Sequence, residues 1–335
     1  MKNKSEIPKI SIFRRIYFFR STYSLEGWKG ERQEMSESSG IQRIGIVYFS
    51  GTGGTETAAR SFAEQAQAKG LVVGLEELGR STGTSARKTL LESSAEWDCL
   101  LLLFPVYATN APAPVYEWIR SWSPAAGQRI AVLSVSGGGE VWPNTGCRAE
   151  CCRQLEKKGF RVVYEAMLCM PCNWLVPTHD HVAMHLLAAL PRKTERILSR
   201  ILSGSIRRTD HRKGFLVRQL AKYEQSGSRS FARKLRVDTT CNGCARCARD
   251  CPTGNIAMHN GRPQFANECL MCFKCVYNCP VRALQSNNIM VLKQGFSLSG
   301  LQRKMKDTPL LPVEECCKGV LWAGVKTYLT DRDGL

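Results

Sequence analysis

Eight of the chain's 16 cysteines lie between residues 241 and 279, in two runs with the same spacing. Three thiolates at i, i+3 and i+6 on a tight turn can bind three corners of one [4Fe–4S] cubane. The fourth cysteine of each run follows after three intervening residues and starts a helix that points the other way, toward a second cubane. The spacing therefore predicts two clusters. Their ligand sets are Cys241, Cys244, Cys247 and Cys279 for one cluster, and Cys269, Cys272, Cys275 and Cys251 for the other.

Disulfides and zinc are the alternatives for these cysteines. A chain of 335 residues has core enough without disulfide staples, and uneven clustering is unlike a disulfide framework. Tetrahedral zinc sites use two C-x-x-C knuckles each and do not need a C-x-x-C-x-x-C-x-x-x-C-P string, which favours iron–sulfur chemistry.

A second candidate site is the glycine- and threonine-rich loop after an apolar run at 43–49. Its backbone N–H groups and hydroxyls could wrap a phosphate at the positive end of the following helix. No Lys-Ser/Thr pair closes the loop as in a nucleoside triphosphate site, and Glu56 stands where a dinucleotide fingerprint has its third glycine. The expected phosphate-binding residues are Ser50, Gly51, Thr52, Gly53, Gly54 and Thr55.

The elements that must position these loops alternate between strands and helices. Apolar runs predict strands at 43–49, 71–78, 97–106, 129–135 and 161–170, with helices at about 55–69, 114–122 and 145–158. This pattern predicts an α/β fold with a doubly wound parallel sheet, covered on both faces. Ligands of such sheets bind at the carboxyl ends of the strands, so the loops after the first, third and fourth strands should carry the site.

Two resemblances follow from these motifs. The S-x-T-G-x-T loop makes residues 43–170 similar to flavodoxins, which implies strand order 2-1-3-4-5 and bound FMN. The cysteine runs make 237–291 similar to the bacterial two-cluster ferredoxins, a small α+β domain. Together they resemble the flavodoxin–ferredoxin fusion proteins of anaerobic bacteria and archaea. The resemblance implies ring contacts from Pro105, Tyr107, Asn110, Ser136, Gly137, Gly138, Gly139 and Trp142, although ordinary packing aromatics remain an alternative for Tyr107 and Trp142.

The expected organisation has five parts. These are a flexible leader or mis-assigned start (1–40), an FMN-binding domain (41–175), a basic helical linker (176–236), the ferredoxin domain (237–291) and a tail with a helix at 313–329. The net charge of +18 is concentrated at 192–236, which has 14 basic and 3 acidic residues. That segment is either solvated surface or a docking site for an acidic redox partner, and nucleic acid is disfavoured because interleaved aromatics are few.

Redox chemistry is the function that these features predict. No apolar stretch reaches membrane-spanning length and no secretory signal is evident, so a cytoplasmic protein is expected. We expect an electron-transfer protein that passes electrons between FMN and two [4Fe–4S] clusters, with redox proteins as donor and acceptor and no residue that performs other catalysis. An FMN-dependent reductase of a quinone or nitro compound, and a redox-sensing regulator that acts through the basic segment, are the alternatives.

Overall fold

The computed structural model describes residues 40–79, 96–124, 126–174, 177–211, 227–229, 231–288, 291–293 and 295–331. All of them belong to one compact unit, Glu34–Leu335. The expected leader therefore lies outside the described residues, apart from residue 40, as do positions 212–226 and 230 of the basic segment.

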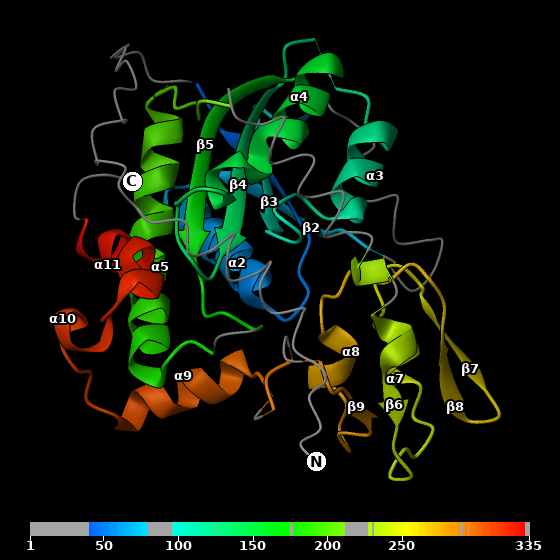
Figure 1. The fold of residues 1–335 in the computed structure, drawn as a ribbon. Coiled ribbons are helices and arrows are strands. Elements are labelled where there is room, and N and C mark those ends of the chain that lie inside the picture. The colour runs from blue at the N-terminus through cyan, green and yellow to red at the C-terminus, as the bar shows by residue number, and fades with distance from the viewer. Residues whose placement is uncertain are drawn as a thin grey trace, which may run out of the picture. The chain divides into compact units, whose positions relative to one another are not determined.

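Five parallel strands form the central sheet in the order β2-β1-β3-β4-β5 (Figure 1). The expected doubly wound, flavodoxin-like order 2-1-3-4-5 is confirmed. The inner strands are fully buried apolar runs, as parallel strands covered on both faces must be. The strands are β1 (Arg43–Tyr48), β2 (Val72–Glu77), β3 (Cys99–Pro105), β4 (Arg129–Ser136) and β5 (Arg161–Cys169).

Four helices cover the sheet, two on each face (Figure 1). Helices α2 (Gly54–Ala68) and α5 (Asp180–Leu202) share one apolar core with the sheet. Helices α3 (Ala113–Ser121) and α4 (Ala149–Lys157) share the other, and the short 3-10 helix η3 (Asn144–Arg148) leads into α4. Two separate cores on opposite faces fix the sheet in the middle layer.

Helix α5 lies within the segment expected to be a linker, but it packs as part of the sheet domain. Its apolar positions are buried in the core that α2 shares with the sheet. A hydrogen bond of 2.7 Å also joins Ser61 Oγ of α2 to Thr194 Oγ1 of α5. The first part of the expected linker is therefore a structural helix of the sheet domain.

The cysteine-rich region consists of short elements. Two antiparallel pairs, β6 with β9 and β7 with β8, accompany two four-residue helices that each begin inside a cysteine run. The elements are η4 (Ala232–Lys234), β6 (Arg236–Val237), α7 (Arg246–Arg249), β7 (Ile256–His259), β8 (Arg262–Phe265), α8 (Lys274–Tyr277) and β9 (Leu284–Gln285).

The C-terminal segment returns to the sheet domain. It contains α9 (Leu298–Asp307), α10 (Val313–Cys316), η5 (Val320–Trp322) and α11 (Ala323–Thr330). The expectation of one helix over 313–329 is wrong, because the chain turns at Gly319, whose φ of 92° is left-handed. Leu298 and Tyr328 join the core under α2 and α5. None of the helices in the described part of the chain has the length and apolar character to cross a membrane.

Candidate redox site

The loop expected to bind phosphate lies between β1 and the start of α2. Ser50 Oγ accepts a hydrogen bond from the Glu56 N–H at 3.2 Å, and the carbonyl of Gly53 accepts one from Thr57. In the described part of the chain, the N–H groups of Gly54 and Thr55, at the positive end of α2, have no acceptor. Free N–H groups at a helix N-terminus suit an anion, so this end of the site fits a phosphate.

The loop after β3 is a tight turn closed by reciprocal backbone hydrogen bonds of 3.0 Å between Tyr107 and Asn110. The Asn110 side chain stays within the turn, because its Oδ1 accepts from the Ala111 N–H and from Tyr116 Oη. Tyr107 stands edge-on to Phe49, with ring centroids 6.2 Å apart. Pro105 is the last residue of β3.

The loop after β4 is shaped by Ser136. Its Oγ accepts from the Gly138 N–H and from Asn144 Nδ2, both at 3.2 Å. Asn144, which was not among the expected site residues, also donates to the carbonyl of Gly139. Trp142 is 54% exposed, so within the described residues it is not packed over another group.

A fourth loop, after β5, lies against the loops after β1 and β4 and was not among the expected site residues. Cys172 packs on Gly137, where a Cβ would come within 2.6 Å of the cysteine Cβ. Asn173 Nδ2 donates to Thr52 Oγ1 at 2.8 Å, and its carbonyl accepts from Tyr277 Oη of α8. The position of Met170–Trp174 directly after β5, at the carboxyl ends of parallel strands, is the signal that could have identified this loop.

The two cysteine runs share one backbone conformation. Gly243 and Met271 have φ of 70° and 56°, and Ala245 and Phe273 have φ of 57° and 60°. Three of these four residues are not glycine, and left-handed backbone is costly for them. The same strained turn, built twice at matching positions, indicates that both runs hold their thiols for a ligand.

The fourth cysteine of each run lies beside the other run. Burial and then the nearby Cys269 and Cys251 thiols raise the pKa of Cys272 to about 12. Burial chiefly raises the pKa of Cys247 too, and Cys244 and Cys279 are its thiol neighbours. Cys251 therefore accompanies the second run and Cys279 the first. This crossed arrangement is the one that the predicted ligand sets require, although cluster binding itself stays a prediction.

Spacing between the thiols bears on the zinc alternative. Thiolates bound at about 2.3 Å to one zinc ion lie about 3.8 Å apart. Among the described residues, the one group of three candidate metal ligands whose atoms all lie within 4.8 Å of one another is Cys152, Glu165 and His211. No three of the eight clustered cysteines are that close, so their donor set fits a cubane better than a single ion.

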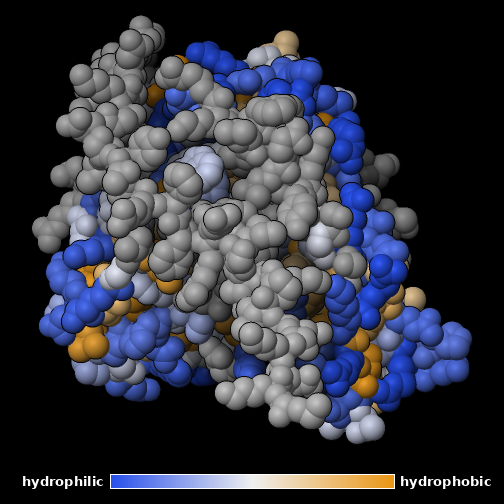
Figure 2. Space-filling view, in the orientation of Figure 1, coloured by the Kyte–Doolittle hydropathy of each residue, from blue (hydrophilic) through white to orange (hydrophobic). Residues whose placement is uncertain are grey.

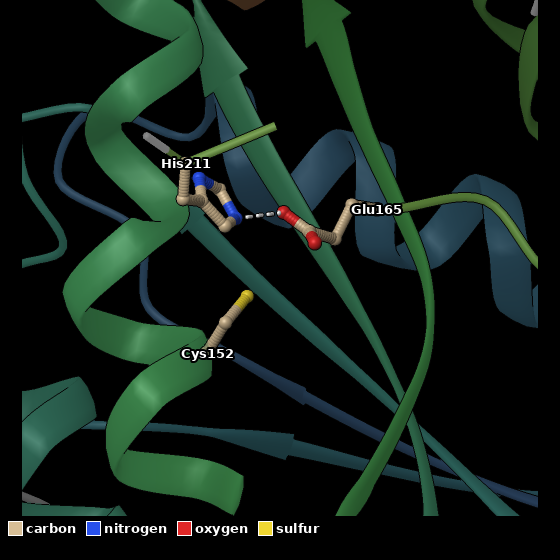
Figure 3. A group of neighbouring side chains, drawn as sticks. All are labelled: Cys152, Glu165 and His211. Carbon is tan, nitrogen blue, oxygen red and sulfur yellow. Dashed lines mark hydrogen bonds and ion pairs between the residues drawn. The ribbon is translucent and has the colours of Figure 1, made fainter. Parts of the chain in front are cut away.

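Cys152, Glu165 and His211 form a buried polar group of another kind (Figure 3). Glu165 Oε1 accepts from Arg208 Nε at 2.9 Å, and Oε2 accepts from His211 Nε2 at 2.9 Å and from Arg148 Nε at 3.3 Å. A cation here would displace these donors and lie beside two guanidinium groups. The carboxylate is therefore already paired, and the group is structural.

The loop expected to bind phosphate, residues 50–55 (the phosphate loop), and the second cysteine run are in direct contact. A Cβ on Gly51 would overlap the Tyr107 hydroxyl and would lie 3.1 Å from both Cβ and the carbonyl oxygen of Cys272. Burial and the Cys272 thiol together raise the pKa of Tyr107 well above its usual value. The absence of a side chain at Gly51 thus brings the loops after β1 and β3 into contact with a candidate cluster ligand.

The cysteine-rich region has a recognisable relative. Residues 233–280 match the family model described as a 4Fe-4S dicluster domain. A flavodoxin–ferredoxin fusion fits the chain. No curated protein matches it. The dicluster region and the sheet order 2-1-3-4-5 support an electron-transfer or redox role for this chain.

Solved structures similar to this chain include flavodoxins. Flavodoxin 2 from Bacillus cereus, in its oxidised form, is 17% identical over 47% of this chain and 99% of its own, with a TM-score of 0.33. The two-electron reduced flavodoxin of Megasphaera elsdenii is 22% identical over 37% and 84%, with a TM-score of 0.30. The NAD(P)H:quinone oxidoreductase of Methanothermobacter marburgensis is 14% identical over 47% and 98%, with a TM-score of 0.33.

Proposed function

We propose that this chain is an electron-transfer protein that binds one FMN and two [4Fe–4S] clusters and exchanges electrons with a separate redox protein. The observation that carries the proposal is the contact of Gly51 and Tyr107 with Cys272, because it joins the two candidate cofactor sites within one chain. When bound, FMN exchanges two electrons and can release them singly, whereas each cluster carries one.

The residues of the sheet edge would hold the flavin. The N–H groups of Gly54 and Thr55 would bind its phosphate, with the Thr52 hydroxyl held by Asn173 beside them. Tyr107 and the backbone of 137–139 would contact the ring. These roles are carried over from the resemblance to flavodoxins and are supported by the shared edge at which the four loops lie.

The eight clustered cysteines would hold the iron as thiolates. The N–H group of Met271 lies 3.3 Å from Cys269 Sγ, and that of Ala283 lies 3.3 Å from Cys279 Sγ. Such N–H···S hydrogen bonds stabilise negative charge on the sulfur and help to set a cluster's potential. One hydrogen bond of this kind falls in each predicted ligand set.

The position of the C-terminal segment favours a carrier over a reductase of small molecules. Leu298 of α9 lies over Gly53 of the phosphate loop, and Gly324 of α11 packs on Gly138 and Gly139. The chain's own helices thus lie beside the loops assigned to the flavin, where a reductase would have to admit an organic substrate next to it. The reductase alternative predicts turnover with a quinone or a nitro compound, and the carrier predicts none.

Cofactor content tests the proposal. The protein is purified without oxygen, reconstituted with iron and sulfide, and assayed for iron, FMN and visible absorption. We expect about eight irons and about one FMN per chain. Cys241→Ser should retain about four fewer irons, whereas Cys316→Ser, outside both runs, should retain all of them.

Two results would contradict the proposal. Full iron without FMN would refute the flavin site and leave a ferredoxin-like region beside a sheet of another function. Zinc in place of iron after anaerobic purification would refute the clusters.

A further inference from the structure

The two cysteine runs have matching turns but different surroundings, and the second run faces the sheet domain. Cys272 and Phe273 are buried. Leu270 packs against the core that α3 and α4 share with the sheet. At the start of α8, Lys274 Nζ lies 3.6 Å from Glu77 Oε1 of β2. Side chains throughout this run therefore contact the part of the chain that carries the candidate flavin site.

Residues 241–250 of the first run show no such contacts among the described residues. The run meets the sheet domain at its end, where Pro252 Cβ lies 3.4 Å from an ideal Cβ on Gly79. Cys244 is the exposed one of the eight clustered cysteines. An ideal Cβ on Gly243 would lie 3.0 Å from the carbonyl oxygen of Gly261, which is in the turn between β7 and β8. Arg249 Nη1 donates to the carbonyl of Cys244 at 3.2 Å. Residues 241–250 thus lie among the short elements of the cysteine-rich region, and Cys244 reaches the surface.

The surface around the first run is basic. Arg249 and Arg246 flank Cys247 on α7, and Arg262 donates to the carbonyls of Val237 and Asp238. Figure 2 shows mainly hydrophilic residues at the outer part of this region, near β7 and β8. Between 233 and 282, Glu268 is the one exposed acidic residue; Asp238 and Asp250 are half-exposed, and Asp250 pairs with Arg246 at 3.4 Å. The exposed basic residues there are Arg233, Lys234, Arg236, Arg246, Arg249, Arg262 and Arg282.

We propose that the two runs have different roles: the second, through Cys272 on Gly51, is the inner contact with the flavin site, and the first is the outlet at which an acidic one-electron redox protein docks. This assignment rests on the proposed function and adds an order to it. It also moves the expected docking site from 192–236 to 241–262. Within 192–236, Arg208 is already paired with Glu165 and Lys193 is buried, so neither is available to a partner.

Exchange at the outlet moves one electron and no proton or other group. The cluster that Cys241, Cys244, Cys247 and Cys279 would hold would give one electron to the partner. It would regain one electron from the cluster that Cys269, Cys272, Cys275 and Cys251 would hold. Opposite charge accelerates such an encounter at low ionic strength and loses its effect as salt screens it.

Arg246 and Lys274 offer a matched pair for the outlet, because each follows the left-handed residue of its run. Dithionite-reduced holoprotein is mixed with ferricyanide, a small anionic one-electron oxidant, and cluster absorbance is followed by stopped flow. At low ionic strength Arg246→Gln should slow oxidation about threefold, and high salt should abolish the difference. Lys274→Gln should stay within about 1.5-fold of the parent. An equal or larger effect of Lys274→Gln would overturn the assignment.

Gly51 and Gly54 test the inner contact from the same loop. A Cβ at position 51 must displace Tyr107 or Cys272, whereas at position 54 it meets only Met170 Cβ at an ordinary 3.7 Å. The measurement is iron loss from holoprotein to bathophenanthroline disulfonate, together with the FMN dissociation constant. We expect two phases of iron loss, with Cys244→Ser removing the fast one. Gly51→Ala should accelerate the slow phase about fivefold or more. Gly54→Ala, whose Cβ would reach no cysteine, should accelerate it less than about twofold even if the FMN dissociation constant changes.

The outcomes separate the order of the sites from the function itself. If the protein holds eight irons and FMN but Cys272→Ser removes the fast phase instead, the order is refuted and the carrier function stands. If no FMN binds, the proposed function fails, yet the two phases still report which run is exposed. Iron loss in a single phase that Gly51→Ala does not alter would refute the inner contact.

Discussion

Replacing Glu165 by Gln should destabilise the sheet domain, because this carboxylate lies in the middle of β5 and has no exposed surface. Arg148, also fully buried, and Arg208 both donate to it. The substitution keeps the shape of the side chain but removes its charge. Arg148 would keep only Glu140, at 2.6 Å, as its partner carboxylate.

The size of the effect follows from the pKa of Glu165. Burial alone would raise this pKa. Hydrogen bonds from His211 and Arg208, together with the charges of His211 and Arg148, outweigh the effect of burial and lower the pKa from 4.5 to about 2. At about 1.4 kcal/mol per pH unit, that difference corresponds to about 3 kcal/mol of stability. This value agrees with the cost of about 3–5 kcal/mol for removing one partner of a buried ion pair. Because the folded-state pKa is lowered, the stabilisation is present above pH 4.5 and is lost as the pH falls toward 2.

Urea unfolding of the holoprotein, followed by far-UV circular dichroism without oxygen, measures the effect. With a slope of about 2 kcal/mol per molar urea, Glu165→Gln should lower the midpoint by about 1.5 M at pH 7. Glu156→Gln is the matched control: Glu156 also pairs with Arg208, at 2.8 Å, but on the surface, so its loss should cost less than about 1 kcal/mol. Equal midpoints for the two variants at pH 7 would refute the reasoning, as would a Glu165→Gln difference that did not narrow below pH 4.5.

Three further substitutions probe the candidate flavin site and the segment that covers it. Gly324→Val should release α11, because a Cβ there would lie 2.6 Å from the Gly138 carbonyl oxygen. Limited proteolysis should then cut the C-terminal segment faster, and an unchanged cleavage rate would contradict the contact. Lys193→Met should cost about 1–2 kcal/mol in urea unfolding, because Lys193 Nζ donates to the carbonyl of Asp331 at 2.9 Å and lies 4.6 Å from the Tyr328 ring. Ser50→Ala should cost about 1 kcal/mol and weaken FMN binding by titration, because the Glu56 N–H loses its acceptor; undiminished affinity would show that this loop does not bind the phosphate.

Local patterns predicted the sheet well. The run Leu100–Leu103 is fully buried because a central parallel strand is covered on both faces, and uninterrupted apolar residues are the direct mark of that position. Glycine and threonine after β1 marked the start of α2, since these residues suit a tight turn at a helix N-terminus. Each of these features depends on neighbours in the sequence.

Pairings between distant segments could not be predicted in the same way. The charge of 192–236 was interpreted as solvated surface or a docking site. Yet Arg207 pairs with Glu140 in the loop after β4, and Arg208 pairs with Glu165 in β5. Nothing near these arginines in the sequence identifies their partners, which lie more than 40 residues away. For the same reason α5 resembled a linker: its charged residues are visible in the composition, whereas its contact with α2 is not.

The glycines of the two loops show where sequence reasoning and structure support different explanations of the same residues. Gly51 was expected to bind a phosphate, and Gly139 was expected to contact the flavin ring. In the folded chain they also admit Cys272 and Gly324, which lie 221 and 185 positions further along the sequence. Gly139 has a left-handed φ of 82° as well, so a side chain there would be strained even without Gly324. A substitution at either glycine therefore disturbs a contact within the chain before any cofactor is considered. Loss of FMN binding in such a variant therefore does not by itself identify a phosphate or ring contact. It must be compared with a variant at a neighbouring glycine that has space for a Cβ, such as Gly54.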